Sequence, residues 1–118
     1  MVVLTDMKIT DIRTGHIVGL RGRDEKFVVV EIQGDKIRLK GATEITALVG
    51  ELKRMKIQPE YLKELGFDVY RGKYAYKTIE LIKIGNIYNL RNMGDSITGI
   101  DYMDEVQDFV KLLTGDSL

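Results

Sequence analysis

The chain has 118 residues, with 18 Lys and Arg against 18 Asp and Glu, no Cys, no Trp, one His and one Pro. The absence of cysteine excludes thiolate zinc sites, iron–sulfur clusters, disulfides and cysteine nucleophiles, and the single His16 excludes a two-histidine metal site. The zero formal charge argues against a protein that wraps a polyanion, although it leaves a local basic face open. This length predicts one compact domain over residues 1–118, with sub-units at 7–58 and 59–118.

No segment predicts export or membrane insertion. The apolar start Met1–Leu4 is followed at once by Thr5 and Asp6, whereas a signal peptide needs an apolar region of about 7 to 15 residues. The longest apolar run in the middle of the chain, Phe27–Val30, is far shorter than the roughly 20 residues that span a bilayer. We therefore expect a cytoplasmic protein without membrane contact.

The first half of the chain is typical of a β-rich structure, because short apolar runs alternate with polar residues and glycines. Gly34-Asp35 predicts a two-residue hairpin loop. The runs predict five short strands, at 17–20, 27–32, 36–40, 43–49 and 55–57. Five strands in about fifty residues fit a small SH3-like β-barrel, which hides its edges, or an open meander.

The strand at 36–40 alternates strictly, so that Ile37 and Leu39 face the core. The opposite side carries a basic row of three cations, Lys36, Arg38 and Lys40. Residues 1–58 hold 11 Lys and Arg against 8 Asp and Glu, while the rest of the chain holds 7 against 10. The basic row is therefore a candidate nucleic-acid contact, although outward cations on an edge strand also prevent aggregation.

The second half begins with a proline and combines a short helix with antiparallel hairpins. Pro59 and the later Gly66 predict a helix over 59–65. Loops at 71–73 and at Gly85-Asn86 separate four predicted strands, at 67–70, 74–77, 78–84 and 87–90. Apolar residues in both phases of 78–84 predict a central strand covered on both faces, or one with a bulge.

The last segment predicts an amphipathic helix with Asp101 as N-cap, Asp104 at its third position and Gly115 as its stop. Its apolar face consists of Tyr102, Val106, Phe109 and Leu113. Its opposite face carries four carboxylates, on Asp101, Asp104, Glu105 and Asp108. Carboxylates on one exposed helix face point away from each other and do not converge on a cation. We therefore expect a solvated face and no metal site.

The residues predict no catalytic site and no cofactor. His16 with Ser96 or Ser117 is the only material for an acyl-transfer triad, and no Gly-x-Ser-x-Gly signature accompanies it. We expect His16 at a strand edge or on the surface. The glycines match neither the dinucleotide nor the phosphate-loop spacing.

Residues 70–77 interleave aromatic and cationic side chains, as surfaces that stack unpaired bases do. Tyr74 and Tyr76 are the candidate stacking residues. The alternative is a hairpin whose tyrosines pack on the core with their hydroxyls in water.

Two segments of the second half resemble a group of small proteins from gut anaerobes and their phages or mobile elements. The matching residues are Ile57, Leu62, Gly66 and Phe67, then Tyr102, Val106, Gln107, Leu113, Thr114, Gly115 and Leu118. Asp104 and Asp108 stand where the group's pattern has histidine and asparagine, and Pro59 is displaced by one place. The resemblance implies a phage or mobile-element setting and carries over no activity and no site residue.

The preferred hypothesis is a non-enzymatic interaction module that binds a protein partner or a second copy of itself. The alternative is a nucleic-acid-binding accessory protein that uses Lys36, Arg38, Lys40, Tyr74 and Tyr76.

Overall fold

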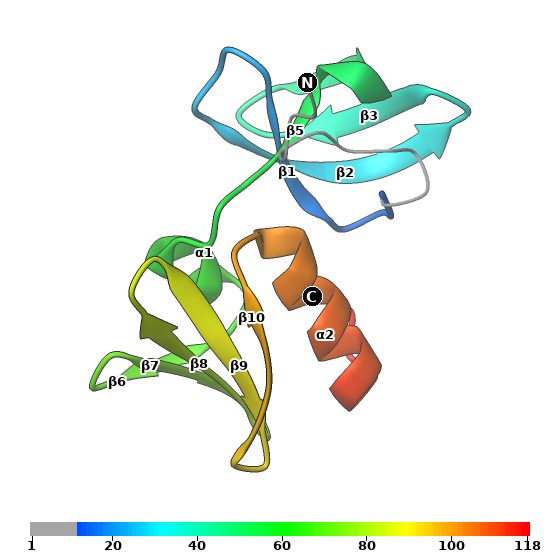
Figure 1. Ribbon diagram of the computed structural model, residues 1–118. Helices are drawn as coiled ribbons and strands as arrows, with labels where there is room; N and C mark the ends of the chain where they lie inside the picture. Colours follow the sequence, from blue (N-terminus) through cyan, green and yellow to red (C-terminus); the bar gives the residue numbers. More distant parts are fainter. Residues whose placement is uncertain (1–11) are drawn as a thin grey trace. The chain divides into compact units, whose positions relative to one another are not determined.

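The computed structural model describes residues 12–118 and has an α+β fold, as the sequence predicts. Two compact units divide the chain, the first ending at Met55 and the second running from Lys56 to Leu118. Each unit contains one five-stranded antiparallel sheet, and the second also holds two α-helices (Figure 1).

The sheet of the first unit has the order β4-β3-β2-β1-β5. Its strands are β1 (Ile17–Leu20), β2 (Lys26–Gln33), β3 (Lys36–Lys40), β4 (Glu44–Leu48) and β5 (Leu52–Arg54). A single turn of 3₁₀ helix, η2 (Val49–Glu51), joins β4 to β5. The predicted strand at 55–57 is wrong, because the fifth strand starts earlier and pairs Leu52 with Leu20.

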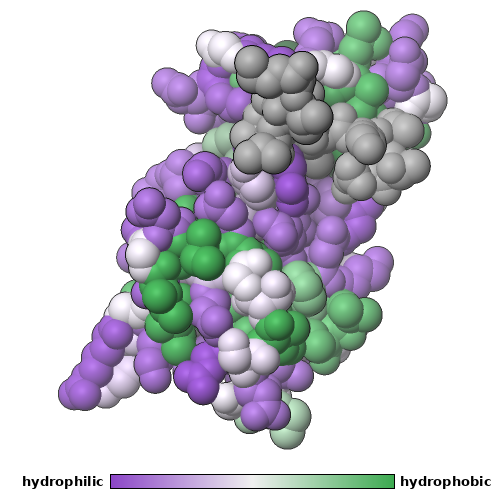
Figure 2. Space-filling view, viewed as in Figure 1, coloured by the Kyte–Doolittle hydropathy of each residue, from purple (hydrophilic) through white to green (hydrophobic). Residues whose placement is uncertain are grey.

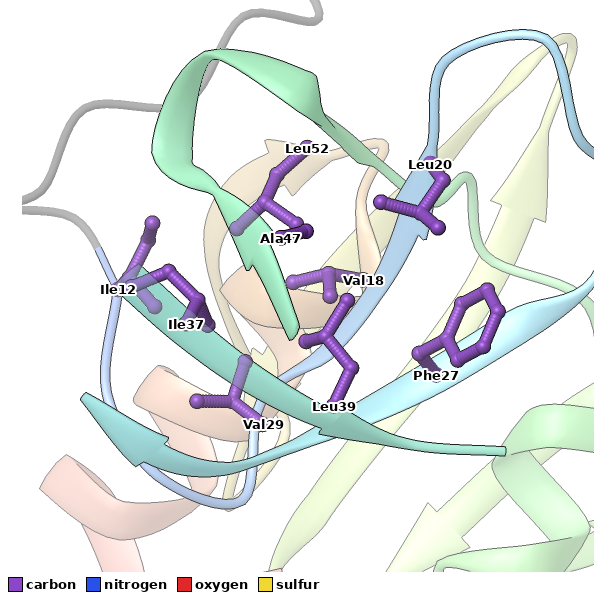
Figure 3. Close-up of a cluster of buried hydrophobic side chains, with 9 residues drawn as sticks. All are labelled: Ile12, Val18, Leu20, Phe27, Val29, Ile37, Leu39, Ala47 and Leu52. Carbon is purple, nitrogen blue, oxygen red and sulfur yellow. The ribbon is translucent and has the colours of Figure 1, made fainter. Parts of the chain in front are cut away.

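The core of the first unit receives side chains from all five strands. Apolar residues alternate with polar ones along β3, which confirms that Ile37 and Leu39 face inward. The buried cluster contains Ile12, Val18, Leu20, Phe27, Val29, Ile37, Leu39, Ala47 and Leu52 (Figure 3). The hairpin at Gly34-Asp35 is also confirmed, with Gly34 at a φ of 61° that favours glycine. The first unit therefore has a core of its own.

The sheet of the second unit has the order β10-β9-β8-β7-β6, a continuous meander. Its strands are β6 (Asp68–Tyr70), β7 (Lys73–Tyr76), β8 (Ile79–Ile84), β9 (Ile87–Asn92) and β10 (Asp95–Ile100). The predicted three-residue loop at 71–73 is wrong, because Arg71 and Gly72 alone form the turn, both with positive φ. The sequence reading also missed β10, which follows a similar turn at Met93-Gly94.

Only one face of the second sheet is covered by the second unit's own core. In β8, Ile79 and Leu81 are fully buried, whereas Ile84, in the other phase, is 60% exposed. The prediction that β8 is covered on both faces, or has a bulge, is therefore wrong, since its pairing with β9 is also regular. The bulge in this sheet lies in β10, between Ser96 and Thr98.

The ends of the two helices of the second unit converge on Tyr76, which lies on the covered face of the sheet. The Tyr76 ring packs on Phe67, just after α1 (Pro59–Glu64), with ring centroids 5.5 Å apart. Its hydroxyl donates a 2.7 Å hydrogen bond to Asp116, just after α2 (Met103–Thr114). Both helices begin and end within two residues of the predicted bounds.

The buried stripe of α2 differs from the predicted one. Tyr102, not Asp101, is the N-cap, and Asp104 is the second helical residue. The buried residues of the helix are Met103, Asp104, Val106, Gln107 and Val110, while Gly115 is the left-handed C-cap that the sequence predicts. The helix is thus rotated relative to the predicted apolar face, because packing against the sheet selects Met103 and Val110 rather than Phe109 and Leu113.

Candidate interaction surfaces

The basic row lies on the outer side of β3, with all three side chains exposed. Arg38 is engaged by acidic residues of both neighbouring strands: its Nε lies 2.9 Å from Glu44, and an Nη lies 3.9 Å from Glu31. Lys40 and Glu44 are cross-strand neighbours in the same sheet. The row is therefore part of a mixed surface of both charge signs.

Tyr74 and Tyr76 lie in the other unit and are half-buried on the covered face of their sheet. Tyr74 packs edge-on against Tyr88, with centroids 6.0 Å apart. The hydrogen bond from Tyr76 and the neighbouring ammonium of Lys77 lower the pKa of Asp116, with the lysine as the larger cause. Both rings are thus engaged in packing within the second unit.

His16 is 1% exposed, so the expected surface position is wrong. It immediately precedes β1, and its Nδ1 accepts a 3.2 Å hydrogen bond from the backbone N–H of Arg13. Ser96 donates a hydrogen bond to Asn89. Ser117 is exposed, one residue before the end of the described chain. The structure gives each of these three residues separate local surroundings.

The acidic side chains of α2 have individual roles, so the expected solvated face is wrong in part. Asp104 is 4% exposed, and Asp101 forms a 3.1 Å ion pair with Lys56. One carboxylate oxygen of Glu105 accepts backbone N–H bonds from Asp101 and Tyr102 at 3.2 Å each, which caps the helix. No group of three metal-ligating side chains is found among residues 12–118.

The sequence did not reveal the uncovered face of the second sheet. Ile84 and Ile87 are directly paired across the β8–β9 hairpin and are 60% and 48% exposed. Ile82 lies on the same face, and Tyr70 at the β6 edge is 66% exposed. We call these four residues the apolar patch. Hydrophobic side chains reach the surface as green areas among purple ones in the space-filling view (Figure 2).

The uncovered face carries charges of both signs. Strand register places Asp68, Glu80 and Arg91 in one row across the sheet, and Lys73 in the next row beside Ile82. Two carboxylates thus accompany two cations in these rows, and a third cation, Arg71, lies over the Tyr70 ring, 5.2 Å from its centroid. A polyanion would find only a small excess of positive charge on this face.

No helix in the described part of the chain is long and apolar enough to cross a membrane. No protein-family model, curated protein or solved structure matches the chain.

Proposed function

We propose that the chain is a non-enzymatic protein-binding module that contacts its partner through the uncovered face of the second sheet. The observation that carries the proposal is the exposure of Ile84 and Ile87 side by side on a sheet whose other face is packed. Contiguous apolar groups rimmed by polar residues are typical of protein interaction sites. The mixed charges around the apolar patch, with only a small excess of cations, favour a protein over a nucleic acid.

The nearest alternative is a nucleic-acid-binding accessory protein that uses the basic row with Tyr74 and Tyr76. Arg38 is shared between two glutamates, and both tyrosine rings are engaged in packing. A titration with single-stranded and duplex DNA at low and moderate salt separates the two functions, because phosphate binding weakens steeply as salt rises. Salt-dependent binding at micromolar protein would favour the alternative.

We also propose that the first unit is an SH3-like barrel rather than an open meander. Its core takes buried side chains from all five strands, although no α-helix among residues 12–55 covers the sheet. The two edge strands, β4 and β5, are joined by only the three residues of η2, which span at most about 10 Å. Those edges must therefore approach one another, which fits a sheet that curls around its core.

The test of the protein-binding function compares the wild type with the double variant Ile84→Lys/Ile87→Lys. Partners are captured from cells of the source organism and identified by mass spectrometry, and self-association is measured by sedimentation velocity. The control is Leu112→Lys, because Leu112 is 76% exposed on α2 and lies outside the patch.

We expect one protein, or a second copy, to bind the wild type and the control but not the double variant. Tyrosine near-UV circular dichroism must be the same in all three, so that loss of binding is not loss of fold. Equal binding by the double variant and the wild type would refute the role of the patch.

A further inference from the structure

The uncovered face of the second sheet is organised in rows that run across the adjacent strands β8 and β9 (Figure 1). Strand register pairs Glu80 with Arg91 and Ile84 with Ile87, with one residue of each pair on each strand. Both pairs lie on the same face, because side chains of a strand return to one face with period two. β8 therefore presents an anion and an isoleucine, and β9 presents a cation and an isoleucine at the same heights.

This arrangement is complementary to itself. A two-fold axis parallel to the strands and midway between β8 and β9 places β8 of one copy over β9 of a second copy. Each residue then faces the residue with which it is paired in its own sheet, so Glu80 faces Arg91 twice and Ile84 faces Ile87 twice. Two sheets that pack face to face with nearly aligned strands are the ordinary arrangement of a β-sandwich.

The middle row and the neighbouring strand also tolerate being covered. Ile82 is paired with Asn89, whose Oδ1 already accepts a 3.1 Å hydrogen bond from Ser96 and so keeps a partner when water is removed. The Cδ1 of Ile87 lies over Gly99, 2.9 Å from the position that a Cβ would take. The apolar surface of Ile87 therefore extends to β10.

The other charges of this face fall outside the two central strands. Asp68, Tyr70 and Arg71 belong to β6 and its turn, and β7 separates them from β8. The same axis carries them past β10 of the second copy, so they stay at a solvated rim where charges contribute little. Lys73 on β7 faces Gly99 of the second copy, which has no side chain to oppose it.

We propose that the occupant of the uncovered face is a second copy of this chain, paired about that axis through Glu80–Arg91 and Ile84–Ile87 contacts. This inference rests on the proposed protein-binding function and names its partner. A second copy supplies both charges and both isoleucines in the required register. Stable interfaces bury about 800 Å² on each partner, and only three rows of two strands meet at the centre here, so we expect a weak dimer with a micromolar to millimolar Kd.

The test is sedimentation velocity of the full-length chain from micromolar to millimolar concentration. The wild type should dimerise, and Ile84→Lys/Ile87→Lys should stay monomeric. Glu80→Arg and Arg91→Glu each place like charges at both contacts and should raise Kd by about tenfold or more. The control Asp68→Arg makes the same change of charge as Glu80→Arg on the same face but on β6, and it should alter Kd by less than about threefold.

An equimolar mixture of Glu80→Arg and Arg91→Glu separates contacts between copies from contacts within one chain. In a mixed dimer the new arginine faces the new glutamate, and the unchanged Arg91 faces the unchanged Glu80. Neither chain regains its own cross-strand pair. We therefore expect the mixture to dimerise with nearly the wild-type Kd, although each variant alone does not, and near-UV circular dichroism must show the same fold in both.

A mixture that dimerises no better than the single variants would overturn the inference, as would a dimer that persists in Ile84→Lys/Ile87→Lys. A monomeric wild type that captures a different protein through the same isoleucines would overturn the second copy as occupant and leave the proposed function standing. A wild type that neither dimerises nor captures another protein would refute both.

Discussion

Replacement of Leu39 by alanine tests the conclusion that the first unit is held together by its own core. The side chain of Leu39 is fully buried in the cluster drawn in Figure 3. Truncation to alanine removes three carbon groups, worth about 0.8 kcal/mol each in transfer from water, or about 2.4 kcal/mol together. The cavity that remains brings the expected loss to about 3–4 kcal/mol.

That loss is large for so small a unit. At roughly 0.05–0.15 kcal/mol per residue, a unit of about 55 residues has a free energy of unfolding of only about 3–8 kcal/mol. With a denaturant slope near 1 kcal/mol per molar urea, the unfolding midpoint of the first unit should fall by about 3 M. The control Leu48→Ala, at a leucine that is 48% exposed on β4, should lower stability by less than about 1 kcal/mol.

The assay can follow the two units separately, because all six tyrosines lie between residues 61 and 102, within the second unit. Far-UV circular dichroism reports on both sheets, whereas tyrosine fluorescence reports on the second unit. We expect Leu39→Ala to lower the unfolding midpoint of the first unit, seen by far-UV circular dichroism, and to leave the tyrosine fluorescence transition of the second unit unchanged. A loss no larger than that of Leu48→Ala would refute the packing argument, and an equal shift in the tyrosine transition would refute separate cores.

Three further substitutions test local interactions. Gly41→Ala should lower the free energy of unfolding in urea by about 1–3 kcal/mol, because the added Cβ meets the buried Phe27 ring. The control Gly50→Ala, with nothing within 4 Å of the added Cβ, should be neutral, and equal effects of the two variants would contradict this reasoning. Glu105→Ala should cost about 1 kcal/mol through loss of its hydrogen bonds to two backbone N–H groups, whereas Asp108→Ala on the exposed side of α2 should cost less in the same measurement. Asp116→Asn should lower Tm at neutral pH, because the hydrogen bonds from Lys77 and Tyr76 lower the pKa of Asp116 in the folded state. That contribution is present above the unfolded pKa of about 3.9 and is lost as the pH falls through the folded pKa, so a Tm difference that persists in strong acid would contradict it.

The candidate site shows where sequence reasoning stops. Strict alternation along 36–40 was enough to place Lys36, Arg38 and Lys40 on one outer face, because side chains of a strand alternate with period two. The engagement of Arg38 by Glu31 and Glu44 depends on how β3 pairs with the strands on either side of it, and alternation within β3 does not specify that pairing. The sequence does indicate that Ile84 and Ile87 are neighbours, since both flank the Gly85-Asn86 turn. Their exposure depends on which face of the sheet the helices cover.

Local chemistry in the sequence alone determined the α+β class, the Gly34-Asp35 hairpin, the inward phase of β3, and the proline start of α1 and glycine stop of α2. Each depends on residues a few positions apart, through turn conformation, strand alternation or capping. Tertiary structure decided the position of β5, the burial of His16 and Asp104, and the face of α2 that packs. Those features depend on pairing and packing between segments distant in the chain, which override local preference wherever a different register buries more apolar surface.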